Sequence, residues 1–135
     1  MTLKELQQRV IALQIGNTME VLQLEATYEA AEEIVEFNKD QLWSGRKADG
    51  EMMPDYADGS GPIKLFDTGS FYDGFFVERK GSFPITISSS DVKTEMLTKR
   101  YGDEIFGLTR ESIKELAENH IQPILVEKIR EELFV

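Results

Sequence analysis

A short stretch near the middle of the chain, LFDTGSFYDGFFV at residues 65–77, carries two carboxylates, a hydroxyl and two glycines. Asp67 and Asp73 are of the residue type that pairs as acid and base or nucleophile in glycoside hydrolases. The alternative is a tight bend, because Asp67 stands directly before Thr68-Gly69, where a short carboxylate can accept hydrogen bonds from backbone amides. No base and no substrate pocket accompanies the pair in the sequence. We therefore favour the bend, and a carboxylate hydrolase stays as a separate hypothesis.

Few other side chains have the chemistry of a catalytic or metal site. His120 is the only histidine, and it lies in a helical pattern with no acid placed to orient its ring. Asp55, Asp58 and the backbone of Gly59 resemble a calcium loop only faintly, because the spacing and terminal glutamate of an EF-hand are missing. The chain has no cysteine, which excludes thiolate chemistry and zinc–thiolate sites. We expect no catalytic residue, no metal, no cofactor and no enzymatic activity.

The composition is that of one folded domain spanning residues 1–135. The hydrophobic fraction is 41%, and eight Phe, four Tyr and one Trp exclude wholesale disorder. The N-terminal sequence MTLKELQQRVIALQIG mixes charged and apolar residues, unlike a signal peptide, and no other stretch approaches bilayer-spanning length. We expect synthesis in a reducing cytoplasm and no association with a membrane.

The charge is strongly negative: fifteen basic residues stand against twenty-five acidic ones, for a net charge of −10. Such a surface repels phosphates, so binding to nucleic acid by charge neutralisation is not expected. It suits a protein partner with basic patches. It also suits a surface past which nucleic acid slides without binding.

The N-terminal third has the apolar spacing of helices. Thr2 and Glu5 form a capping signal, and Gly16-Asn17 interrupts the pattern before a second, longer helix for which Asn17 and Glu20 offer the cap. The apolar positions predicted to face inward are Leu3, Leu6, Val10 and Leu13 in the first helix and Val21, Leu24, Tyr28, Ala31, Val35 and Leu42 in the second. The opposite face of the second helix is predicted to be solvated, and it carries Glu25, Glu29, Glu32, Glu33 and Glu36.

The centre of the chain changes to loop and strand patterns. Residues 44–62 hold four glycines and two prolines, which predicts a long loop that is either functional or mobile. Phe71 to Arg79 and Phe83 to Ser88 are prone to form strands, and Lys80-Gly81-Ser82 between them predicts an antiparallel hairpin. Pro84 places the second strand at an edge or starts it there.

The last part of the chain is predicted to be helical. A short helix capped by Ser88–Asp91 is expected to turn Val92, Met96, Leu97 and Tyr101 inward and to end at Gly102. Thr109 begins a long final helix that Pro123 should kink, and its inward stripe is Ile113, Leu116, His120, Ile124, Lys128 or Ile129, and Leu133. The predicted class is α+β, with a long N-terminal helical segment, a central antiparallel β-hairpin or small sheet, a short helix and a C-terminal helix.

Several short motifs follow one another in a family-like order over about residues 18–134. They are Trp43-Ser-Gly45, Asp49-Gly50, Tyr56, Leu65-Phe-Asp-Thr-Gly69-Ser-Phe71, Phe76-Val77, Tyr101-Gly102 and Phe106-Gly-Leu-Thr109. In this order the chain resembles the virion morphogenesis or tail-completion proteins of tailed bacteriophages, in the group similar to the Mu-like tail-completion protein and related head–tail connector proteins. It departs from that group at Tyr72-Asp73-Gly74, where relatives often have a basic residue and then a serine.

The resemblance implies a structural, non-enzymatic virion protein of the neck or tail top. Such a protein acts in head–tail joining or tail completion as part of an axial ring, and it is assembled in the cytoplasm of the bacterial host. The implied partners are portal, connector or tail proteins and further copies of the chain. Carboxylates lining the ring would let DNA pass without sequence-specific binding.

Loop 44–62 and its aromatic neighbours are the expected contact points of such an assembly. Trp43 and Tyr56 fit a core role and an interface role equally well. The full set of interface candidates is Trp43, Met52, Met53, Tyr56, Phe71, Tyr72 and Phe106. The competing hypothesis is a small acidic cytoplasmic interaction or inhibitor protein, which would use the glutamates between Glu25 and Glu36 to imitate nucleic acid.

Overall fold

The computed structural model describes residues 1–14 and 17–134, and it confirms the predicted α+β class. Strand β1 (Phe75–Val77) pairs with strand β2 (Ile87–Ser89) in an antiparallel two-stranded sheet, with Phe76 opposite Ser88. The helical elements are α1 (Leu3–Gln14), α2 (Thr18–Glu29), α3 (Ala31–Trp43), α4 (Ser70–Asp73), α5 (Thr94–Tyr101), the 3₁₀ turn η1 (Asp103–Ile105), α6 (Arg110–Leu116), the π-helical segment η2 (Ala117–Ile121) and α7 (Gln122–Phe134).

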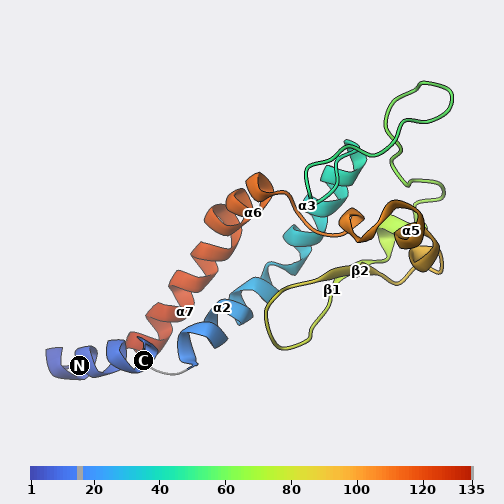
Figure 1. Cartoon of the computed structure of the whole chain (residues 1–135). Helices are drawn as coiled ribbons and strands as arrows, with labels where there is room; N and C mark the ends of the chain where they lie inside the picture. Colours follow the sequence, from blue (N-terminus) through green and yellow to red (C-terminus); the bar gives the residue numbers. More distant parts are fainter. Residues whose placement is uncertain (15–16, 135) are drawn as a thin grey trace.

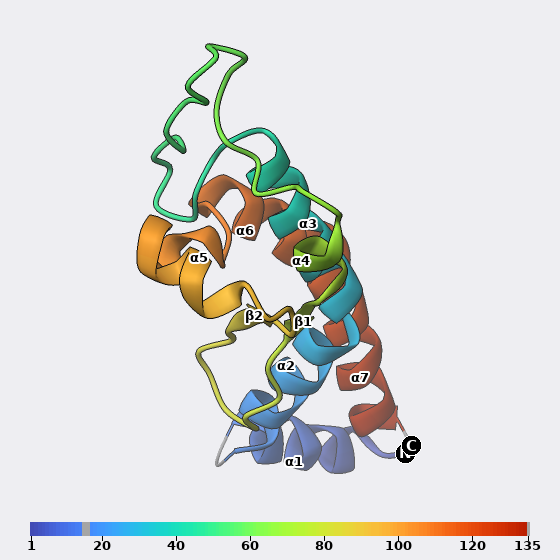
Figure 2. The same cartoon turned by 90° about the vertical axis from the view of Figure 1, so that its right-hand side faces the viewer.

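The helices form two long rods that lie side by side (Figure 1). Helices α2 and α3 make the first rod, and α6, η2 and α7 return beside it in the opposite direction, with α2 against α7 and α3 against α6. Helix α1 packs on both α2 and α7 at the end of the rods where the two chain termini lie (Figure 2). The small sheet packs on α3, on the side of the first rod away from α7.

The predicted helix start at Thr2 is confirmed. The Thr2 amide donates to a Glu5 carboxylate oxygen at 3.2 Å, and the Glu5 amide donates to the Thr2 hydroxyl at 3.1 Å. The predicted break is also found, since α1 ends at Gln14 and α2 begins at Thr18, although the Asn17 side chain makes no capping hydrogen bond. Gly16 lies outside the described residues.

The single long helix predicted after this break is divided in two. Ala30 has φ −89° and ψ 14°, which ends α2 and begins α3 without a glycine or proline to mark the place in the sequence. The inward face of α2 is also shifted by one position: Val21 is exposed, and Leu22 and Ala26 are buried instead. On α3, Val35 and Leu42 are buried as predicted.

The predicted hairpin is present, but its two strands are much shorter than predicted. The prediction for the start of its first strand was wrong. Phe71 and Tyr72 lie in the helical turn α4, because Gly69 takes a φ of 90° and the Thr68 hydroxyl accepts a hydrogen bond from the Ser70 amide at 3.4 Å. Strand β2 begins at Ile87, well after Pro84. Gly74 is required between α4 and β1, since a Cβ there would lie 2.6 Å from the Ser89 hydroxyl.

For the short helix and the final helix, the sequence predicted the helix ends better than it predicted which residues are buried. Helix α5 ends at Gly102 and α6 begins with the Thr109 hydroxyl accepting from the Ser112 amide at 3.3 Å. Val92, predicted to point inward, is 94% exposed, and Met96 is also exposed. The helix irregularity expected at Pro123 is found one turn earlier, in η2, where the proline ring would crowd the preceding turn.

Two side-chain amides of α3 hold the segment between η1 and α6. Asn38 is fully buried; its amide nitrogen donates to the Ile105 carbonyl at 3.1 Å, and its oxygen accepts from the Gly107 amide at 2.9 Å. Gln41 repeats the pattern one turn later, donating to the Gly107 carbonyl at 3.0 Å and accepting from the Thr109 amide at 2.8 Å. We call these four hydrogen bonds the amide clamp. The clamp supplies hydrogen bonds to the backbone of residues 105–109, as a neighbouring strand would do in a sheet.

We expect Asn38→Ala to lower the free energy of unfolding by about 3 kcal/mol, because the buried carbonyl of Ile105 and amide of Gly107 lose their partners. The measurement is urea unfolding followed by the fluorescence of Trp43, the single tryptophan. The exposed neighbour Asp40, changed to Ala, is the control and should alter stability by no more than about 0.5 kcal/mol. Equal stability of the two variants would contradict the role given to the clamp.

Candidate interaction surface

Residues 44–66 form a projecting segment without a helix or a named strand, as predicted for loop 44–62. Its outer part, residues 54–63, is closed on itself by the Ile63 amide donating to the Pro54 carbonyl at 2.9 Å and the Tyr56 amide donating to the Gly61 carbonyl at 2.8 Å. We call residues 54–63 the arm and residues 45–53 its root. The arm stands away from the body of the molecule in both views (Figures 1 and 2).

Lys64 fixes the direction in which the arm leaves the body. Its backbone amide donates to the Tyr56 hydroxyl at 3.1 Å, and its carbonyl accepts from the Tyr72 hydroxyl at 2.6 Å. Its ammonium group donates to the Trp43 carbonyl at 2.6 Å and lies 4.5 Å from the centre of the Trp43 ring. Four contacts on one residue make the arm a braced projection.

Aromatic rings complete this brace. Trp43, Phe66 and Tyr72 meet edge to face, with ring centres 5.4 Å apart for Trp43–Phe66 and 5.6 Å apart for Phe66–Tyr72. Burial, with the Tyr56 phenol nearby, raises the pKa of Tyr72 well above its usual range. The Tyr72 phenol therefore stays protonated and continues to donate to the Lys64 carbonyl at any ordinary pH.

The structure divides the seven interface candidates between the surface and the core. Trp43, Met52 and Tyr56 remain 48%, 47% and 36% exposed. The other four pack within the chain: Met53, Phe71 and Tyr72 are buried, and Phe106 is partly buried against the core. These four side chains are apolar or aromatic because they pack in the core. Of the predicted interface residues, only Trp43, Met52 and Tyr56 therefore form part of the surface.

Of the residues considered for catalysis, Asp67 and His120 make contacts of their own that do not join them to one another. The Asp67 carboxylate lies 3.4 Å from the Lys93 ammonium, and the cap expected of Asp67 is provided by Thr68. Asp73 is exposed at the end of α4, and His120 packs edge to face on Phe37 with ring centres 5.6 Å apart. Within residues 1–14 and 17–134, these contacts bring no histidine to either carboxylate.

The aspartates that faintly resembled a calcium loop lie at the end of the arm. The Asp58 carboxylate accepts hydrogen bonds from Ser60, including its amide at 2.9 Å, and these bonds lower the pKa of Asp58 below its usual value. This is the geometry of a turn closed by a side chain. Among residues 1–14 and 17–134, no three His, Cys, Asp or Glu side chains are grouped to hold a metal ion.

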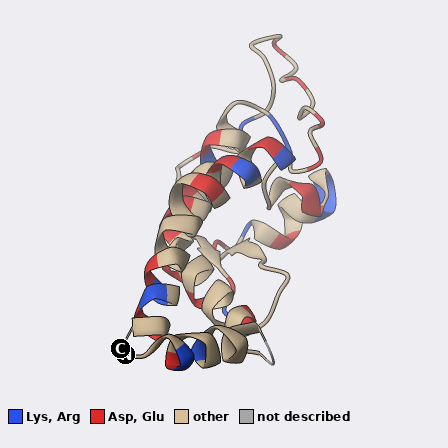
Figure 3. Ribbon diagram, turned by 90° about the vertical axis from the view of Figure 1, so that its left-hand side faces the viewer, with Lys and Arg blue, Asp and Glu red and all other residues tan. Residues whose placement is uncertain are grey.

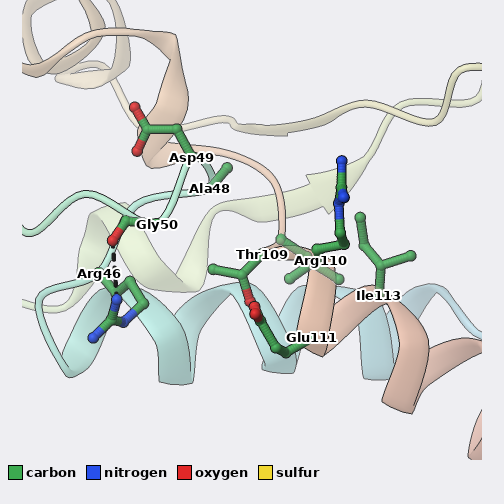
Figure 4. A pocket seen from close by; sticks show the side chains of 9 residues that line it. Arg46, Ala48, Asp49, Gly50, Thr109, Arg110, Glu111 and Ile113 are labelled. Carbon is green, nitrogen blue, oxygen red and sulfur yellow. Dashed lines mark hydrogen bonds between the residues drawn. The ribbon is translucent and has the colours of Figure 1, made fainter.

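An open cleft of about 840 Å³ separates the root of the arm from the first turn of α6 (Figure 4). Its apolar lining comes from Ala48, Leu108 and Ile113, and Arg110 projects into the opening. Arg46, Asp49, Gly50, Thr109 and Glu111 complete the lining. Sequence reasoning missed this cleft because its two sides are far apart in the chain, and the amide clamp brings the second side into place at Thr109.

The negative charge is concentrated in two parts of the molecule. Residues 18–43, which span α2 and α3, hold seven acidic residues and one lysine; residues 48–63 hold four acidic residues and no basic one; the rest of the chain holds fourteen of each. The entire excess therefore belongs to residues 18–43 and 48–63, which are the first helical rod and the arm with the adjoining part of its root. Figure 3 shows acidic residues on the projecting arm and no basic residue there.

Most glutamates of α2 and α3 are exposed as predicted, and three of them also pair with lysines. The Lys39 ammonium lies 3.4 Å from the Glu36 carboxylate on α3 itself. The Lys128 ammonium of α7 lies 2.7 Å from the Glu29 carboxylate and 3.7 Å from that of Glu25. The Glu29 hydrogen bond raises the pKa of Lys128, so this amine stays charged over the physiological range. The pair ties the two rods together and neutralises part of the acidic face.

Comparisons with protein-family models, curated proteins and solved structures find no match to this chain. Among the described residues, no helix combines the length and the apolar character needed to cross a membrane.

We expect Tyr72→Phe to loosen the arm, because the variant keeps the buried ring and removes the hydrogen bond to the Lys64 carbonyl. The expected results are faster hydrogen exchange at the amides of Tyr56 and Ile63 and a loss of about 1 kcal/mol of stability. Tyr101→Phe is the matched control, since no hydrogen bond of that hydroxyl is found in the described part of the chain. Unchanged exchange in the arm of the Tyr72 variant would contradict the brace.

Proposed function

We propose that the protein is a structural component of a tailed-phage virion, acting at the neck or tail top in head–tail joining or tail completion as part of an axial ring. The observation that carries the assembly role is the braced arm. A projection that places a rigid, exposed segment outside the fold is suited to contact another chain at low entropic cost, because its shape is set before binding. The phage assignment comes from the resemblance of the motifs between Trp43 and Thr109.

The charge distribution supports a place on the path of DNA. Residues 18–43 carry six net negative charges, and most of their carboxylates are exposed along one rod. If this rod faces the lumen of a ring, the carboxylates repel the phosphates of the passing genome and keep it from adhering. The protein then needs no sequence-specific contact with DNA.

The second candidate function is the acidic interaction or inhibitor protein, favoured by the same exposed carboxylates of α2 and α3. Contact between Lys128 and two of these glutamates weakens the likeness to a regular row of phosphates. A carboxylate hydrolase is not favoured, because Asp67 is paired with Lys93 and no base lies beside it.

The experiment is mass spectrometry of virions purified from the host strain that carries the gene, together with particles from a strain in which the gene is interrupted. We expect several copies of this chain in each intact virion. Without the gene, heads and tails should accumulate unjoined or incomplete, and a plasmid copy should restore them.

Absence of the chain from intact virions, with normal particles formed by the interrupted strain, would overturn the proposal. Capture of a single host nucleic-acid enzyme by the purified protein, lost when the glutamates of α3 are changed to glutamine, would then favour the inhibitor.

A further inference from the structure

We infer that the arm tip of one copy of the chain docks in the cleft between the root and α6 of a second copy. The tip is the part of the arm at residues 55–60. This inference rests on the self-assembly proposed above, and it names the two surfaces that carry the contact.

The shapes of the two surfaces are complementary. All residues from Asp55 to Ser60 are exposed on a narrow projection, and the cleft is an open hollow of about 840 Å³. The arm cannot fill the cleft of its own chain, because the hydrogen bonds of Lys64 direct it away from the body. Each copy therefore offers one free tip and one free cleft, which is the condition for a contact that passes from copy to copy.

The floor of the cleft provides apolar contact. Ile113 is 53% exposed, and Leu108 and Ala48 lie partly exposed beside it. The tip carries Ala57 and the exposed part of Tyr56 for this floor. Covering Ile113 removes apolar surface from water on both sides of the contact.

The charges are complementary as well. The cations that line the cleft are Arg46 and Arg110, and neither of them forms an ion pair within the described residues. The Arg46 guanidinium donates to the Gly50 carbonyl at 2.9 Å. The tip carries Asp55 and Asp58, and no basic residue occurs between residues 48 and 63.

Two acidic residues also line the cleft. The Asp49 carboxylate is already engaged by the Glu51 amide at 3.0 Å, and Glu111 lies beside Thr109 (Figure 4). Arg110, which projects into the opening, remains to receive the carboxylates of the tip.

The absence of cysteine from the chain makes disulfide trapping a direct test. Ala57→Cys places a thiol on the tip and Ile113→Cys places one in the cleft. The two full-length variants are mixed, one carrying an affinity tag, and oxidised under mild conditions, so that a tip–cleft product differs in mass from products between identical copies. Val92→Cys, at an exposed position in the turn before α5 and outside the cleft, replaces the Ile113 variant in the matched control.

We expect a tagged–untagged covalent dimer from the tip and cleft variants, and at most a trace from the tip and Val92 variants. The product should be lost at high salt and with the reversal Arg110→Glu in the cleft partner. The reversal Lys99→Glu plus Arg100→Glu on α5 should leave it unchanged. Equal yields from the cleft and Val92 variants would overturn the inference.

The outcome is separable from that of the virion experiment. If the chain is present in virions and the cleft reversal removes it, yet no tip–cleft product forms, another virion protein occupies the cleft and this inference fails while the proposed function stands. If the product forms and the chain is absent from virions, the contact holds and the phage role fails.

Discussion

The amide clamp is the constraint on which the rest of the structure depends. Asn38 and Gln41 are buried or nearly so in α3, and each uses both ends of its side-chain amide on the backbone between Ile105 and Thr109. A buried backbone segment with no helix or sheet of its own must satisfy its polar groups elsewhere, or it costs several kcal/mol. The clamp meets this need, and it fixes the residue at which α6 begins.

The same segment also positions the arm. The Ala48 amide in the root donates to the Glu104 carbonyl at 2.7 Å, and the Met53 amide donates to the Gly45 carbonyl at 2.7 Å, with the Met53 side chain buried. The root is thus attached at Ala48 to η1, directly before the clamped segment, and at Met53 to the core. Lys64 and its aromatic neighbours hold the chain in place where it returns from the arm to the body of the molecule. The arm and the cleft therefore keep a fixed relation within each copy, which a repeated contact between copies requires.

How far the fold could be predicted depends on the range of the interactions. Several signals within a few residues were confirmed, namely the Thr2–Glu5 cap, the end at Gly102 and the start at Thr109. The cap expected of Asn17 is not formed. The turn α4 was missed because the aromatic residues Phe71 and Tyr72 favour strands by composition, whereas the backbone at Gly69 and the hydroxyl of Thr68 start a helical turn.

The interaction surface was predictable only in part. Loop 44–62 was identified by its glycines and prolines, but the cleft depends on contacts across the chain that no local pattern reveals. One signal was available: Asn38 and Gln41 lie on the stripe of α3 that also carries Ile34 and Leu42, and polar residues on an inward stripe need a buried partner.

The most direct measurement is an electron cryomicroscopy reconstruction of the neck and tail top of the virion at side-chain resolution. The account predicts a closed ring of this chain in which each arm tip lies against Ile113 and Arg110 of the adjacent copy, with the acidic rod of α2 and α3 toward the DNA. A virion without the chain, or a ring in which the arms project into solvent and the clefts stay empty, would contradict it.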